Sequence, residues 1–164
     1  MQYWKLPPKE KIYEAFSVLA DQRYIMESDA RAIVISSGGE KKYKVEWTED
    51  NSDPGQAVSI ISNDNASFWQ GYTGYPIIAI LMLNNRISFD KEVLVHFRGI
   101  NWNTLNRQFK NNYAEAVGKI LSEIDDKTIV EKIISEVGSI YKQLSALKLA
   151  RPGNQGQGTN QDSA

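Results

Sequence analysis

The spacing of hydrophobic residues changes along the chain, from helical to alternating and back to helical. Apolar residues at positions i, i+3, i+4 and i+7 form one face of a helix, and this spacing predicts a helix over residues 8–20. The apolar face is formed by Ile12, Ala15, Phe16 and Leu19. We expect four charged residues to lie on its solvent face: Lys9, Lys11, Glu14 and Asp21.

Alternation then predicts strands over residues 24–27, 30–36, 41–48 and 57–62, because side chains of a strand point to opposite faces in turn. In the third strand, Tyr43, Val45 and Trp47 alternate with charged residues. A turn at Gly38 and Gly39 joins the second strand to the third. A three-residue loop would pair Ile35 with Tyr43, whereas a two-residue loop would pair Val34 with Tyr43. The apolar pattern favours the three-residue loop.

The least ordinary stretch is residues 63–83, which begins polar, becomes rich in aromatic residues and glycine, and ends in the apolar run 77–83. Proline suits the first position of a helix, where no N–H donor is needed. Pro76 therefore favours a helix over residues 76–84, and its uniformly apolar sequence predicts that it is buried. A buried strand is the alternative, since periodicity does not distinguish the two in a short run.

The C-terminal half returns to helical spacing. Ser88 is the candidate N-cap of a helix that ends near Gly99, and Asn101 is the candidate N-cap of a helix over residues 102–124. A last helix follows residues 125–126, with Thr128 and Glu131 fitting a capping box. Its apolar seam steps by three and four residues through Val130, Ile133, Val137, Ile140, Leu144 and Leu147. An antiparallel helical hairpin within one chain explains this seam, and a homodimer through residues 128–149 is the alternative.

These elements predict one α+β domain over residues 1–150. It has an N-terminal helix, an antiparallel sheet of three to four strands, a buried central helix and a C-terminal helical hairpin. Strands grouped before helices argue against a parallel βαβ sheet. We expect residues 151–164, rich in Gly, Gln and Asn, to be a disordered tail because they contain little that could be buried.

Composition narrows the classes of function. The 164 residues carry a net charge of −1 and no cysteine, which excludes disulfides, thiolate zinc sites and cysteine nucleophiles. The absence of cysteine fits a cytoplasmic protein. The longest apolar run is far shorter than the ~20 residues of a membrane span, so we expect no membrane association.

Candidate catalytic chemistry is sparse. His96 is the single histidine, and no nucleophile elbow, Walker loop or dinucleotide fingerprint accompanies it. Asp50, Asn51 and Asp53 resemble the start of a calcium loop, but Pro54 and the lack of a closing glutamate break the match. We therefore expect no metal or cofactor, and the sequence favours a non-enzymatic role.

The aromatic and glycine-rich loop at residues 63–75 is the first candidate site, for an unknown protein or a small ligand. Trp, Tyr, Gly, Ser and Asn build adaptable contact surfaces. The candidate binding residues are Asp64, Ser67, Trp69, Gln70 and Tyr72. The alternative is that the loop covers the edge of the core. In both cases we expect the loop to be ordered, with Phe68, Trp69, Tyr72 and Tyr75 packed beside the central helix.

A nucleic-acid interface over residues 89–119 is the second candidate. Residues 86–119 contain six Lys or Arg side chains against three Asp or Glu. Asn and Arg read base edges, and Lys and Arg bind phosphate. The residues expected on an outer helix face are Asn103, Asn106, Arg107 and Lys110.

Overall fold

The structure is a computed structural model that describes residues 2–48 and 58–152. Residues 49–57, with the weak calcium-loop match at Asp50, Asn51 and Asp53, lie outside the described ranges, as do residues 153–164 of the predicted tail. The elements in chain order are β1 (Gln2–Tyr3), α1 (Glu10–Ala20), β2 (Tyr24–Ser28), β3 (Arg31–Ile35), β4 (Lys42–Thr48), β5 (Val58–Ser62), η1 (Ala66–Gln70), α2 (Tyr75–Leu83), η2 (Lys91–Phe97), α3 (Trp102–Gln108), α4 (Tyr113–Ser122), α5 (Lys127–Ala146) and β6 (Leu149–Arg151).

The fold is mixed α+β, with a six-stranded sheet in the order β1-β6-β5-β4-β3-β2. The prediction of three to four antiparallel strands was incomplete. It missed the two short terminal strands β1 and β6, and β6 pairs parallel to β5. β6 also corrects the predicted start of the tail, because Arg151 belongs to this strand and not to a disordered segment.

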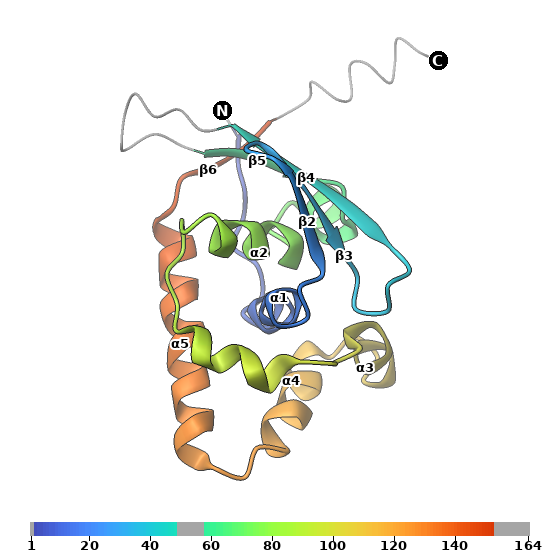
Figure 1. Ribbon diagram of the computed structural model, residues 1–164, viewed down its shortest axis with the longest axis vertical. Helices are drawn as coiled ribbons and strands as arrows, with labels where there is room; N and C mark the ends of the chain where they lie inside the picture. Colours follow the sequence, from blue (N-terminus) through green and yellow to red (C-terminus); the bar gives the residue numbers. More distant parts are fainter. Residues whose placement is uncertain (1, 49–57, 153–164) are drawn as a thin grey trace.

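The helices pack in layers below the sheet (Figure 1). α1 and α2 lie next to the sheet, and α3, α4 and η2 lie further from it. α5 then runs back toward the sheet and delivers the chain into β6. Among the described residues, no helix is long and apolar enough to cross a membrane.

The predicted register of β3 and β4 was wrong. Val34 pairs with Tyr43, and Ile35 pairs with Lys42. Val34 and Val45 are fully buried, whereas Ile35 is half-buried on the other face. β3 is apolar on both faces, so its pattern did not identify the inward face; burial against α1 and α2 selects the register instead.

α2 confirms the buried central helix. Proline occupies its first turn, and residues from Pro76 to Met82 are all buried. The helix is apolar on every side because neighbouring elements cover every side, including α1 and the inner face of the sheet.

Two predictions for the following segment were wrong. The helix expected after Ser88 is the 3₁₀-helix η2, which is capped by Asp90, while Ser88 bonds to Gln143. The long helix expected over residues 102–124 is divided into α3 and α4. Asn101 does cap α3, as predicted, and Asn112 provides a second cap for α4.

The apolar seam of α5 is buried inside the chain. Ile133, Val137, Ile140 and Leu144 are at most 4% exposed, which agrees with the intramolecular interpretation. A homodimer through residues 128–149 would have to use other side chains, and it stays a prediction. The N-cap of α5 is Asp126, which accepts from the Thr128 amide at 2.9 Å, in place of the predicted capping box.

Candidate functional site

A polar cleft of about 1040 Å³ brings the two predicted sites together. Its walls come from α1, the β3–β4 turn with the start of β4, the segment that includes η1, and the α3–α4 segment. The lining residues are Lys11, Glu14, Glu40, Lys41, Tyr43, Asp64, Asn65, Ala66, Trp69, Gln70, Tyr72, Tyr75, Asn103, Asn106, Arg107, Lys110, Asn111 and Tyr113. Every predicted site residue except Ser67 is among them.

Asp64 and Ser67 anchor the wall that includes η1 to the interior of the protein. The Asp64 carboxylate accepts hydrogen bonds from the hydroxyls of Ser62 at 2.5 Å and Ser67 at 2.7 Å, and from the Ser67 amide at 3.1 Å. The Gly74 amide in turn donates to Ser67 Oγ at 3.2 Å. Asp64 is 4% exposed. This network holds the loop to the start of α2.

The aromatic residues of η1 point outward instead of packing on the core. Phe68 is 54% and Trp69 is 75% exposed, so the expectation that both are buried was wrong. The reason is local: the π-helical turn directs Ser67 inward to Asp64 and the next three side chains outward. Phe68 and Trp69 pack edge to face, with ring centroids 4.7 Å apart. Gln70 is also exposed.

The floor of the cleft is a buried ion pair that sequence reasoning missed. Lys11 Nζ lies 2.9 Å from Glu14 Oε2, and Asn106 Nδ2 donates to Glu14 Oε1 at 3.2 Å. Lys11 Nζ also lies 4.0 Å from the ring centroid of Tyr113, a cation–π contact. The assignment of Lys11 and Glu14 to the solvent face was wrong, because α3 and α4 cover that side of α1.

Burial and pairing act in opposite directions on this pair. Burial raises the pKa of Glu14, while Lys11 and the Asn106 amide oppose that rise. Burial alone would lower the pKa of Lys11, but the Glu14 carboxylate reverses the effect and leaves this pKa raised. Lys11 is therefore a cation at neutral pH, partnered by Glu14 at the bottom of the cleft.

Tyrosine side chains complete the inner surface. Tyr75 is half-buried and packs edge to face against Tyr43, with ring centroids 6.2 Å apart. Burial raises the pKa of Tyr75, and the nearby Tyr43 adds to the rise. Tyr72 lines the cleft half-buried, and burial also raises its pKa. These phenols are therefore neutral hydrogen-bonding groups over the whole physiological pH range.

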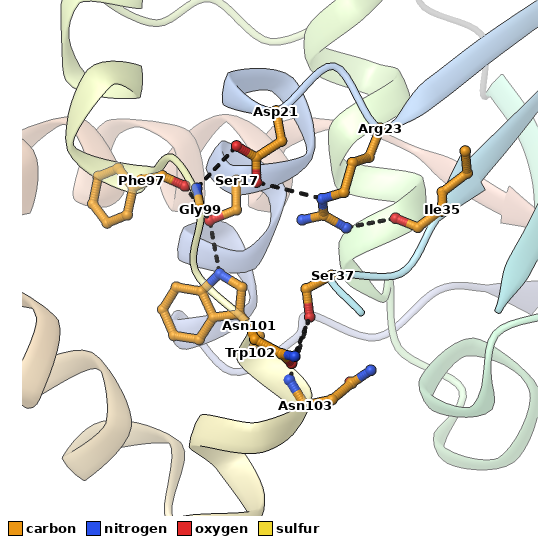
Figure 2. Close-up of polar contacts among 10 residues, drawn as sticks. All are labelled: Ser17, Asp21, Arg23, Ile35, Ser37, Phe97, Gly99, Asn101, Trp102 and Asn103. Carbon is orange, nitrogen blue, oxygen red and sulfur yellow. Dashed lines mark hydrogen bonds and ion pairs between the residues drawn. The ribbon is translucent and has the colours of Figure 1, made fainter. Parts of the chain in front are cut away.

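A polar clamp fixes the start of α3 against α1 (Figure 2). The Trp102 indole donates to Ser17 Oγ at 2.7 Å, and the Ser17 hydroxyl donates to the Phe97 carbonyl at 2.8 Å. The Gly99 amide donates to Asp21 Oδ1 at 2.9 Å. The first bond joins α3 itself to α1, and the other two join the segment before α3 to α1 and its C-cap residue. The wall formed by α3 is therefore positioned by the N-terminal helix.

A second set of contacts ties the same wall to the sheet. Arg23 donates to the Ile35 carbonyl, and its Nε lies 3.6 Å from Asp21 Oδ2, an ion pair visible in Figure 2. Ser37 Oγ lies 3.4 Å from both the Asn101 side chain and the Asn103 amide. The two Ser37 contacts are long and therefore weak, but they place Asn103 beside the β3–β4 turn.

The turn between α3 and α4 has unusual backbone geometry. Lys110 and Asn111 have φ values of +52° and +63°. Asparagine tolerates this left-handed region, whereas lysine rarely adopts it. The Asn111 amide donates to the Asn106 carbonyl at 2.7 Å and closes the turn. As a result, the exposed side chains of Lys110 and Asn111 border the cleft.

The second predicted site is only partly the outer helix face that was expected. Asn103, Arg107 and Lys110 are exposed, but Asn106 is 9% exposed and bonded to Glu14. The outer-face expectation was therefore wrong for Asn106, because the covered side of α3 faces α1. These four residues line a concave surface instead of projecting as a groove-reading ridge.

Among residues 2–48 and 58–152, no three His, Cys, Asp or Glu residues form a group that could hold a metal ion. His96 is half-buried on η2 and does not line the cleft. The cleft itself offers hydrogen-bonding groups, aromatic rings and side chains of both charges.

Comparison with known proteins identifies a family. No curated protein and no solved structure matches the chain. Residues 4–150, which include every described cleft element, match the family described as "Uncharacterised conserved protein UCP014422". The chain belongs to this family.

Proposed function

We propose that the chain is a binding protein that holds an anionic ligand or partner segment in the cleft between η1 and α3. The observation that carries the proposal is the distribution of charge. Lys41, Arg107 and Lys110 are exposed and line the cleft. Within residues 2–48 and 58–152, none of them forms an ion pair.

The cleft's carboxylates offset this positive charge only in part. Glu14 is neutralised by Lys11, and Asp64 is surrounded by three neutral hydrogen-bond donors. Glu40 is the remaining lining carboxylate. A cleft with several unpaired cations and neutral amides attracts anions.

Binding is favoured over catalysis by the state of the two buried carboxylates. A general base must reach the proton that it removes. Asp64 accepts from two hydroxyls and an amide, and Glu14 accepts from Lys11 and Asn106. Both groups are thus committed to partners within the protein, in keeping with a non-enzymatic role.

The geometry supports one site in place of two alternatives. The loop site and the nucleic-acid site were predicted separately, and residues of both line the same cleft. Arg107 and Lys110 of the predicted nucleic-acid site and the exposed Trp69 of the loop site can therefore contact the same ligand. Duplex groove reading is not favoured, because Asn106 is buried and the surface is concave.

Thermal unfolding with a panel of anions tests the proposal. The panel contains phosphate, pyrophosphate, citrate, ribose 5-phosphate, nucleotides and an oligoglutamate peptide. A ligand at 100 times its Kd stabilises the folded state by about 2.7 kcal/mol. We expect at least one anion to raise the Tm of the wild type and of Lys127→Glu, and to raise that of Lys110→Glu much less.

Lys127→Glu is the matched control because Lys127 is exposed at the start of α5 and does not line the cleft. Both variants change the net charge by the same amount. Equal Tm shifts in Lys110→Glu and the wild type would reject the cleft as the anion site. A panel in which no anion raises the wild-type Tm would reject the function.

A further inference from the structure

We propose that the ligand of the cleft is an unpaired nucleotide, whose base stacks on Trp69 and whose phosphate is held by Arg107 and Lys110. This inference rests on the proposed function and names the class of its ligand. The same chemistry is offered by a free nucleotide and by a residue of a single-stranded nucleic acid.

Trp69 is the first reason. Trp69 is 75% exposed, although a buried tryptophan contributes more to stability than almost any other side chain. Its backbone position is fixed, because η1 follows directly from the buried Asp64–Ser67 network. Phe68 packs against it with an interplanar angle of 82°. A tryptophan held open at the border of a cleft is a platform for a flat, apolar ring.

The backbone of the wall formed by the α3–α4 segment is the second reason. Two consecutive non-glycine residues, Lys110 and Asn111, are held at positive φ. Strain of this kind persists where the surrounding structure enforces it and is concentrated at functional sites. Here the strained turn presents a lysine to the cleft, next to Arg107 from the last turn of α3. A phosphate group suits this pair, because Arg binds it through a planar fork and Lys as a point charge.

Neutral amides on both walls are the third reason. Gln70, Asn103 and Asn111 are exposed and line the cleft. An amide side chain can donate and accept at once, as the edge of an unpaired base requires. An aromatic platform, cations and amides in one concave site form the combination used for single-stranded nucleic acid. A simple polyanion would not need the exposed indole.

The cleft also has the size for this ligand. Its volume of about 1040 Å³ lies just above the range of small-molecule sites, roughly 300–1,000 Å³. A duplex could not place its stacked and paired bases against Trp69 without being opened. The geometry thus selects unpaired bases.

Binding of two probes tests the inference: AMP, followed by Trp fluorescence or calorimetry, and a fluorescein-labelled ten-residue oligouridine, followed by anisotropy. We expect Trp69→Ala to weaken the affinity for whichever probe binds by roughly 5- to 150-fold. Trp69→Phe should retain most of the affinity. Lys110→Ala should weaken binding and reduce the dependence of log K on log salt by about one unit.

Tyr3→Ala and Lys127→Ala are the matched controls, because both positions are exposed and neither lines the cleft. Both should bind as the wild type does. Binding of AMP identifies a free nucleotide as a sufficient ligand, and binding of oligouridine alone identifies a nucleic-acid strand; either result supports the inference. Because Trp69 is exposed, its variants should keep the wild-type Tm, which separates loss of binding from loss of folding.

Two results with AMP and oligouridine would overturn the inference. One is the absence of binding to both probes at low salt, and the other is wild-type affinity in Trp69→Ala. Ribose 5-phosphate serves as the probe without a base. If it binds as tightly as AMP and is lost in Lys110→Glu, the anion-binding function stands and the nucleotide inference is wrong.

Discussion

At the scale of single residues, the floor of the cleft removes two opposite charges from water. Lys11 and Glu14 have side chains that are 9% and 7% exposed. Desolvation of such a pair is expensive, and replacing only one member leaves an uncompensated charge. The pair therefore constrains the site more strongly than its contribution to net stability would suggest. The contribution of the pair to the free energy of unfolding can be measured by varying the pH.

Lys11→Met should be destabilising by about 3–5 kcal/mol at neutral pH, because Glu14 would remain buried without its cation. Burial already raises the pKa of Glu14, and loss of Lys11 should raise it further. A carboxyl whose folded-state pKa lies above its unfolded value costs stability as pH rises through the folded pKa. The difference in unfolding free energy between wild type and Lys11→Met should therefore be smaller at pH 4 than at pH 8.

Urea unfolding of both proteins across this pH range measures the effect. Adding Glu14→Gln to Lys11→Met removes the titrating group and should remove most of the pH dependence of that difference. A difference that is constant with pH, or that shrinks as pH rises, would show that Glu14 is not the buried partner.

Gly74 is required by close packing at the loop anchor. A Cβ added there would lie 2.3 Å from Asp64 Oδ2 and 3.1 Å from Ser67 Oγ. Gly74→Ala should therefore destabilise the protein by about 1–3 kcal/mol through overpacking. The control is Gly118→Ala in α4, where a Cβ meets nothing within 4 Å and helix propensity predicts a gain of up to ~1 kcal/mol. Chemical denaturation that ranks the two variants in the opposite order would contradict this packing.

At the scale of elements, the turn between α3 and α4 combines strain with a cation that faces the cleft. Lys110→Gly should stabilise the protein by about 0.5–1 kcal/mol. Relief of roughly 1–2 kcal/mol of left-handed strain is partly offset by the larger unfolded-state entropy of glycine, roughly 0.5–1 kcal/mol. The same change should weaken anion binding, because it removes the charge.

Lys110→Ala is the matched variant, since it removes the same charge but keeps a Cβ at positive φ. It should weaken binding by a similar factor without the gain in stability. Thermal melts and anion titrations on both variants separate the two effects. If Lys110→Gly proved less stable than Lys110→Ala, the result would contradict a strained positive φ at residue 110.

Elements with strong local signals were predictable, and those determined by distant contacts were not. α1, α2 and β2 to β5 follow the apolar pattern to within about two residues, since each has a distinct apolar face or is apolar throughout. The break between α3 and α4 was missed because Phe109 and Tyr113 continue the helical spacing through it. β6 was missed because three residues contain no usable period, and its partners β1 and β5 lie far away in sequence.

At the scale of the whole molecule, the C-terminal strand closes the fold. β6 lies between β1 and β5 in the sheet, so it joins the two ends of the chain to the central strands. Leu149 is 5% exposed and belongs to the core. The Trp4 amide donates to its carbonyl at 3.0 Å.

Leu149→Ala should cost about 2–5 kcal/mol, as for a buried large-to-small truncation. Leu6→Ala is the control, because Leu6 is 43% exposed and surface changes are usually within about 0.5 kcal/mol. Equilibrium denaturation measures both. Equal and small effects would show that Leu149 is not part of the core and would contradict the proposed role of β6 in closing the fold.

The site was predictable in its parts and not as a whole. Both groups of candidate residues were visible from composition, since Trp69 and Gln70 lie in an unusual loop and Arg107 and Lys110 in a locally basic segment. Their convergence depends on the clamp between α1 and α3, which joins residues about 80 positions apart. Lys11 and Glu14 looked like a solvent face because nothing local showed that α3 and α4 cover it.

The central claim is that η1 and the α3–α4 segment form one binding site, and a ¹⁵N NMR titration with AMP tests it most directly. The Trp69 indole N–H, the Asn106 side-chain amide and the Lys110 backbone amide should shift together and give a single Kd. The indole of Trp47, buried in the sheet, should not move. Shifts confined to one wall, or shifts on the two walls with different Kd values, would contradict a single site.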